Sequence, residues 1–249
     1  MKTGFCFLVK ESLNNCSLWE QFLHSAMPNS FGLYVHAKTS SPRPVLSESC
    51  IDLEPLDTAW GDRSLVAATQ RLLSIAVDDG CDSMVLVSGD MLPLQPFDWI
   101  QSFCKQTRFS LQQKVGLDQQ QTIANAMRFA RIAPYFGLPI NQLKKQNMFF
   151  IMTRNDFCRI CENASIMSFP LLELADEYYW VNHAIRIGAE WKSSNVVFCN
   201  PDPTRTQALN MELTPKLLHF CRSVDYGFIR KVAGIDAQAV ADLINVYAL

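Results

Sequence analysis

The stretch Ser83-Met84-Val85-Leu86-Val87-Ser88 decides the fold that the sequence predicts. It is almost wholly apolar, which is typical of a central strand covered on both faces. It stops at Gly89-Asp90, and Pro93 and Pro96 then lead into an expected helix over 97–103. A strand that is buried on both faces needs a layer of helices on each side, so this stretch predicts an α/β protein.

The residues before this strand alternate between strand and helix patterns. Strands are expected at 5–9 and 31–36, and a short extended segment between 45 and 55. Apolar residues at helical spacing predict one helix over 17–27 and another that Asp62 or Ser64 caps. This order predicts a Rossmann-like half with a mixed, mostly parallel sheet and right-handed crossovers over residues 1–110.

Ligands of such folds bind beyond the carboxyl ends of the strands. In this chain those ends are Val9-Lys10, His36-Ala37-Lys38 and Ser88-Gly89-Asp90, and the turn that begins at Thr58 follows the short extended segment. We therefore expect a ligand at these positions.

The second half predicts a strand at 148–152, a helix to about 163 capped by Thr153 or Asn155, and a helix at 176–187. Residues 112–142 are polar and indicate an irregular insertion on the binding side, with a helical piece around Arg128 and Arg131. Further elements are expected at 195–198, 214–220, 228–232 and 236–247. Because there is no internal repeat and no linker, residues 1–249 are expected to form a single domain.

Composition excludes some classes of function. The net charge of −2 gives no case for broad binding to nucleic acid or to anionic membranes. No apolar run has the length of a membrane span, and the run at 5–9 is too short for a signal peptide. Nine cysteines cannot all pair within one chain, which favours a reducing, cytoplasmic location with buried thiols.

Several motifs are absent from the chain. It has no Gly-x-Gly-x-x-Gly, Walker loop, Gly-x-Ser-x-Gly or His-Glu-x-x-His, and its four histidines lack ligand spacing. Cys158-x-x-Cys161 is interpreted as two thiols that face the core, because no second pair accompanies it. Ser88-Gly89-Asp90 carries one carboxylate instead of the Asp-x-Asp with which many nucleotide-sugar enzymes hold a divalent ion.

The stretch Ala175-Asp176-Glu177-Tyr178-Tyr179-Trp180 has two interpretations. Two carboxylates in the first turn of a helix are favourable because unpaired N–H groups and the helix dipole stabilise negative charge there. The stretch is then a charged helix start above an aromatic core face. Alternatively, one carboxylate lies at the mouth of a pocket with aromatic walls, as a general base for a sugar hydroxyl would.

Taken together, the segments resemble the core-2/I-branching β-1,6-N-acetylglucosaminyltransferases and their relatives, which include peptide O-xylosyltransferases. The similar segments keep the family's order over almost the whole chain. They are Phe5-Cys6-Phe7-Leu8-Val9 with Leu18-Trp19, Leu33-Tyr34-Val35-His36, Trp60-Gly61-Asp62-Arg63-Ser64, Val85 to Pro93, Lys144 to Phe150 with Thr153-Arg154, Asp176-Glu177-Tyr178-Tyr179-Trp180, Pro203-Thr204-Arg205-Thr206 and Phe228-Ile229-Arg230-Lys231.

The resemblance implies a GT-A fold and an inverting, metal-independent transfer from a UDP-sugar, such as UDP-N-acetylglucosamine or UDP-xylose, to a hydroxyl of a glycan acceptor. Glu177 matches the family's base, and Asp176 is expected to cap the helix and aim its neighbour. Arg205 and Lys231, with Arg230 as the substitute, match the basic residues that stabilise the departing diphosphate. Residues 1–110 would then bind the nucleotide sugar, and residues 111–249 would bind the acceptor and carry catalysis.

Acceptor contacts are expected from Lys144, Lys145, Tyr178 and Trp180, with Arg128 and Arg131 as further candidates. His36 departs from the aspartate of some family members, and the family's N-terminal anchor is not seen. A non-catalytic carbohydrate- or nucleotide-binding module on the same scaffold is therefore an alternative. The missing glycine fingerprint argues against a dinucleotide-dependent oxidoreductase.

Overall fold

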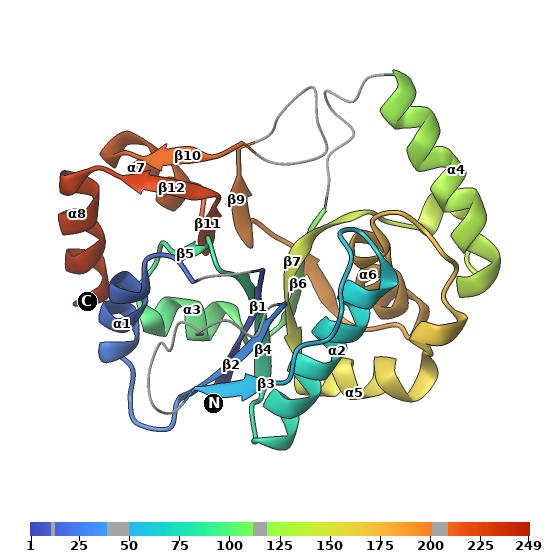
Figure 1. The fold of residues 1–249 in the computed structure, drawn as a ribbon, viewed down its shortest axis with the longest axis horizontal. Helices are drawn as coiled ribbons and strands as arrows, with labels where there is room; N and C mark the ends of the chain where they lie inside the picture. Colours follow the sequence, from blue (N-terminus) through green and yellow to red (C-terminus); the bar gives the residue numbers. More distant parts are fainter. Residues whose placement is uncertain (11–12, 39–49, 112–118, 201–208) are drawn as a thin grey trace.

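The computed structural model describes residues 1–10, 13–38, 50–111, 119–200 and 209–249. Within these residues, seven strands form the central sheet in the order β3-β2-β1-β4-β7-β6-β8 (Figure 1). In chain order they are β1 (Thr3–Val9), β2 (Phe31–Ala37), β3 (Ile51–Leu53), β4 (Ser83–Ser88), β6 (Thr107–Leu111), β7 (Gln146–Thr153) and β8 (Trp191–Ser193). The expected α/β fold with a mostly parallel sheet, consistent with a GT-A-like architecture, is confirmed.

Helices cover both faces of this sheet (Figure 1). On one side α2, α5 and α6 pack against the strands and one another, and on the other side lie α1, α3 and α8. The helices are α1 (Cys16–His24), α2 (Arg63–Asp78), α3 (Phe97–Phe103), α4 (Gln119–Phe136), α5 (Arg154–Asn163), α6 (Ala175–Arg186), α7 (Pro215–Ser223) and α8 (Ala237–Tyr247). Asp62 caps α2, Thr153 caps α5 and Asp236 caps α8, each by accepting a backbone N–H bond.

One strand of the sheet, β7, runs against its neighbours. It pairs antiparallel with both β4 and β6, whereas the remaining pairs in the sheet are parallel. The start of β7 therefore lies at the edge where β1, β2, β4 and β6 end. This edge, which we call the carboxyl edge, brings together the strand ends that the sequence predicts as a ligand site.

Two small sheets complete the fold: β5 (Leu92–Pro93), β11 (Phe228–Arg230) and β9 (Val197–Cys199) form one, and β10 (Met211–Leu213) pairs with β12 (Val232–Ile235) in the other. The loop after β4 is fixed from several sides. The Gly89 carbonyl accepts from the Asn14 N–H at 2.7 Å, and the Met91 carbonyl accepts from the Trp19 indole at 2.8 Å. These bonds tie the loop at the end of the central strand to Asn14 and to α1.

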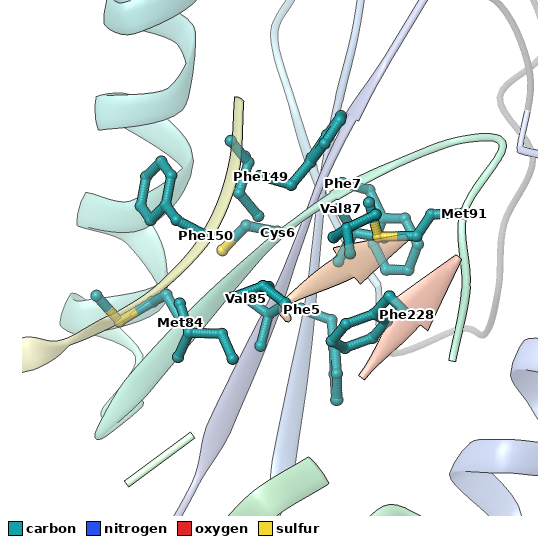
Figure 2. Packing of buried hydrophobic residues seen from close by; sticks show 14 of the residues in the cluster. Phe5, Cys6, Phe7, Met84, Val85, Val87, Met91, Phe149, Phe150 and Phe228 are labelled. Carbon is teal, nitrogen blue, oxygen red and sulfur yellow. The ribbon is translucent and has the colours of Figure 1, made fainter. Parts of the chain in front are cut away.

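The core lies around β1 and β4. Side chains from β1, β4, β7 and β11 gather there in one buried cluster (Figure 2). Met84, Val85, Leu86 and Val87 are all at most 1% exposed, as the wholly apolar pattern of β4 predicts. His36 and His183 are also buried, at 1% and 0% exposure.

Two expectations for the middle of the chain need correction. The helical piece predicted around Arg128 and Arg131 is confirmed, but it is longer than expected: 119–136 form the helix α4 and are not irregular, while 112–118 lie outside the described residues. Strand β6 was not predicted at all. It is short and contains Arg108, whose guanidinium lies 4.1 Å from the Phe103 ring and donates to the Phe103 carbonyl. Cys158 and Cys161 are free and partly buried thiols.

Candidate functional site

The start of α6 is docked on the turn that contains Trp60 and Gly61. The Ala175 N–H donates to the Gly61 carbonyl at 2.9 Å. Gly61 has a φ of 69°, and a Cβ at this position would lie 3.0 Å from the Leu174 nitrogen, so the close approach requires glycine. Leu174 is the N-cap, in the left-handed conformation, and makes no side-chain cap. The expectation that Asp176 caps this helix is therefore wrong, because Asp176 lies inside the first turn.

The two neighbouring carboxylates have different environments. Asp176 is 5% exposed, and its Oδ1 has no hydrogen-bond partner among the residues that the structure describes. Burial, and then the charge of Glu177, raise the pKa of Asp176 to about 7. A carboxyl group with this pKa holds its proton below neutral pH, and its burial makes Asp176 the less accessible of the two carboxylates.

Glu177 keeps access to solvent. Its side chain is 15% exposed, and its Oε2 lies 3.0 Å from the Nζ of Lys145, which is 13% exposed. The Lys145 ammonium also lies 5.9 Å from the centre of the Tyr178 ring. A carboxylate at a helix N-terminus beside a cation is stabilised in its charged form. Glu177 is thus the more accessible of the two carboxylates.

The aromatic residues after Glu177 do not form the walls of an open pocket. Tyr178, Tyr179 and Trp180 are at most 2% exposed, and the Trp180 ring packs 5.7 Å from Phe150 and 6.1 Å from Phe157. Three consecutive residues span roughly 200° around a helix, so all three are buried only because α6 is covered on several sides. The expectation that Tyr178 and Trp180 present ring faces to an acceptor is contradicted by this burial.

A different tryptophan is exposed near α6. Trp60 is 63% exposed and directly precedes Gly61, whose carbonyl binds the start of α6. The sequence predicted a turn at Trp60 that resembles the family's, and gave Trp60 no role in binding. The exposure of Trp60 could have been predicted from the sequence, because a tryptophan beside a glycine in a tight turn has little core to pack against.

The basic residues predicted to bind the acceptor make different contacts. Lys145 contacts Glu177 directly, whereas Lys144 is bound through its main chain to the Asn182 side chain. Arg128 on α4 donates to Glu173 at 2.8 Å. Of the predicted acceptor residues, the structure therefore brings Lys145 next to Glu177.

A second ion pair lies where β4 and β11 end. The Asp90 carboxylate accepts from the Ser88 hydroxyl and from Arg230, with Nε to Oδ1 at 3.3 Å and Nη2 to Oδ2 at 3.4 Å. The guanidinium carbon of Arg230 lies 4.6 Å from the centre of the Phe149 ring. The Val232 N–H donates to the Asp90 carbonyl at 3.3 Å, so the chain around Lys231 is tied to the same loop. Ser88, Gly89, Asp90, Arg230 and Lys231 thus lie together.

The remaining residues that were predicted to bind the nucleotide differ in their exposure and contacts. The buried Val9 accepts the Lys38 N–H through its carbonyl, and Lys38 donates its ammonium to the Thr58 carbonyl. His36 is buried and its Nε2 accepts the Leu56 N–H at 2.8 Å, so His36 holds the chain after β3 and does not face a ligand. Lys10 is exposed at the end of β1. Arg205 lies outside the described residues.

Strand β7 connects the two ion pairs. Lys145 directly precedes this strand and contacts Glu177, and Phe149 lies four residues later under Arg230. Four residues along a strand correspond to about 13 Å. Both ion pairs therefore contact the first section of β7, where this strand begins at the carboxyl edge.

The described ranges contain neither a metal-binding cluster nor a membrane-spanning helix. No group of three or more histidine, cysteine, aspartate or glutamate side chains there could hold a metal ion. None of the helices in those ranges is long and apolar enough to cross a membrane. The expectations of a metal-free reaction and a cytoplasmic location stay predictions.

A protein-family model described as Core-2/I-Branching enzyme matches residues 3–154, more than half of the chain. The chain belongs to the Core-2/I-branching enzyme family. Membership indicates a glycosyltransferase that acts on a nucleotide sugar and a glycan. The matched part of this branching-enzyme chain contains Asp90 and Lys145 and ends before Glu177 and Arg230. No curated protein sequence matches the chain.

Proposed function

We propose that this branching-enzyme relative transfers a sugar from a UDP-sugar to a hydroxyl of a glycan by a single inverting displacement without a metal. One observation carries the proposal. Glu177, partly exposed and held by Lys145, lies at the same sheet edge as Arg230 and Lys231, with strand β7 joining the two groups.

The reaction assigns one task to each group. The acceptor oxygen attacks the anomeric carbon while the bond from that carbon to the diphosphate oxygen breaks. The hydroxyl proton passes to the Glu177 carboxylate, and UDP leaves. Attack from the face opposite to the leaving group inverts the anomeric configuration.

The diphosphate gains negative charge as it departs, and fixed cations must stabilise it. Arg230 and Lys231 are proposed for this task, together with Arg205 from the family resemblance. Asp90 supports Arg230, because a carboxylate that accepts from two guanidinium nitrogens fixes the plane of the group. The pairing also offsets the charge of Asp90, which would otherwise repel a diphosphate.

The acceptor side is proposed to include Trp60 and Lys145. An exposed indole offers an apolar face for the C–H groups of a sugar ring, and the ammonium of Lys145 can donate to a sugar hydroxyl. A buried core that contains residues from Phe5 to Tyr247 supports the proposal of a single domain for both substrates.

The test is UDP release from a panel of UDP-sugars, with and without EDTA. We expect at least one UDP-sugar to be turned over with a glycan acceptor, at a rate that EDTA does not change. Glycan binding without turnover of any UDP-sugar would instead support the non-catalytic binding module. Loss of turnover in EDTA that returns with added divalent metal would contradict the metal-free mechanism.

A further inference from the structure

Asn182 is a fully buried amide whose side chain makes hydrogen bonds both within its own helix and outside it. It lies on α6 at 0% exposure. Its Oδ1 accepts the Lys144 N–H at 2.8 Å, and its Nδ2 donates to the Lys144 carbonyl at 2.8 Å. The same Nδ2 donates to the Tyr178 carbonyl at 2.7 Å. One side chain therefore binds both main-chain polar groups of a residue 38 positions away.

The residue that it binds lies in a connection. Lys144 follows the short 3₁₀ helix at Ile140–Gln142 and precedes β7, which begins at Gln146. Sheet and helix hydrogen bonds normally fix the main chain, and here an amide side chain supplies an equivalent pair of bonds. These bonds set the direction in which the chain enters β7, and so the position of Lys145.

The position of Lys145 determines the ion pair of Glu177. Lys145 follows Lys144 directly, and its Nζ lies 3.0 Å from the Glu177 Oε2. Glu177 and Asn182 belong to the same helix, five residues apart. A single rigid element thus carries the carboxylate and, through Lys144, determines where the cation beside that carboxylate lies.

We propose that Asn182 is a positioning residue: by holding the main chain of Lys144 it places the Lys145 ammonium against Glu177. The inference rests on the proposed function only in taking Glu177 as the base. The amide is specific for the task, because it presents one acceptor and one donor at the spacing of a peptide group. Aspartate would place a second acceptor against the Lys144 carbonyl, and threonine would lose at least one of the two bonds.

The first test measures how readily the Lys145 amine is acylated, and it needs no enzymatic turnover. Wild type, Asn182→Asp and Asn182→Thr are treated briefly with an amine-acylating reagent, and acylation of each lysine is quantified by mass spectrometry. Lys2, which pairs with Asp79 at 2.8 Å, is the internal reference. We expect acylation of Lys145, relative to Lys2, to rise severalfold in both variants, because its ammonium leaves the ion pair.

Circular dichroism and thermal unfolding identify any variant that has not folded, and the threonine variant serves if the aspartate variant fails. Unchanged acylation of Lys145 in a folded variant would overturn the inference. Since this readout needs no substrate, it stands even if no UDP-sugar is turned over. Conversely, an active enzyme with unchanged acylation would contradict the role of Asn182 and leave the proposed function intact.

The second test is a double-mutant cycle of Asn182→Asp with Lys145→Met in the UDP-release assay. If Asn182 acts through Lys145, the double variant is no slower than Lys145→Met alone, and Asn182→Asp lowers kcat with little change in the KM for the UDP-sugar. Losses that multiply, or a matching rise in the KM for the UDP-sugar, would show that Asn182 acts on the structure generally and would overturn the inference.

Discussion

The two ion pairs of the carboxyl edge contain the same kinds of group in opposite roles. At the start of α6, Glu177 is proposed to accept the proton, and the ion pair with Lys145 positions its carboxylate. At the end of β4, Arg230 is proposed to stabilise the departing diphosphate, and the ion pair with Asp90 positions its guanidinium. The first pair has a contact of 3.0 Å at a helix N-terminus, and its cation lies 5.9 Å from the Tyr178 ring. The second pair has two longer contacts, and its cation lies closer to an aromatic ring, 4.6 Å from that of Phe149. The comparison shows how similar pairs can serve a proton acceptor on one side and a charge stabiliser on the other.

The largest effect is expected from removing the base. Glu177→Gln keeps the size of the side chain and cannot accept the proton, so turnover should fall by about 10²- to 10⁴-fold. UDP binding, measured by calorimetry, should stay unchanged. Glu173→Gln is the matched control, because Glu173 is an 80% exposed carboxylate nearby, and it should retain the wild-type rate. An unchanged rate in Glu177→Gln would remove the role given to this residue.

The next largest effect is expected on the other side of the comparison. Arg230→Gln should lower kcat by about 10²-fold, because one cation no longer stabilises the leaving diphosphate. The measurement is UDP release at saturating donor. Arg154→Gln, which removes a half-exposed cation paired with Asp82, should leave the rate unchanged. A loss in Arg154→Gln equal to that in Arg230→Gln would show that overall charge decides the rate.

Removing the supporting carboxylate should cost less than removing the cation it supports. Asp90→Asn keeps a hydrogen-bond acceptor for Arg230 and removes the charge, so a decrease of about tenfold in kcat/KM is expected. Steady-state kinetics for the donor test this expectation. A variant that is faster than wild type would mean that the charge of Asp90 opposes diphosphate binding more than its contact helps Arg230.

The smallest effect on catalysis is expected at Asp176, where stability should respond instead. Burial raises its pKa from 3.8 to about 7, so the folded state binds a proton that the unfolded state releases above pH 3.8. This group therefore lowers the free energy of unfolding as the pH rises from about 4 to 7, by at most about 4 kcal/mol. Asp176→Asn should be more stable than wild type at pH 8 and similar at pH 4.

Urea unfolding at pH 4, 6 and 8 measures that difference. A difference between Asp176→Asn and wild type that does not change with pH would show that Asp176 binds its proton equally in the folded and unfolded states. The expected pH dependence would support two separate environments for adjacent carboxylates.

Much of the fold could be predicted because its signals are local. The apolar run of β4 and the caps at Asp62 and Thr153 depend on neighbours in the sequence. The burial of Trp180 was one of two interpretations of its stretch, and the sequence could not decide between them, since a helix that is apolar on several sides does not reveal which side is covered. Asn182 gave no local signal either, because its function depends on a loop 38 residues away.

In the candidate site, too, the sequence predicted what depends on local motifs and missed what depends on tertiary contacts. Glu177, Arg230 and Lys231 could be proposed from ordered motifs, whereas the partners Lys145 and Asp90 were proposed without knowing which charge each contacts. His36 was misjudged because its ring binds a backbone N–H after β3, a contact that depends on tertiary structure.

The central claim is a direct, metal-free displacement in which Glu177 takes the proton. Proton NMR of the product formed by the wild-type enzyme in EDTA tests this claim most directly. The coupling constant between the anomeric proton and the proton on the neighbouring ring carbon reports the anomeric configuration. From an α-linked UDP-sugar the account predicts a β-linked product. An α-linked product would show retention of configuration and would contradict the account.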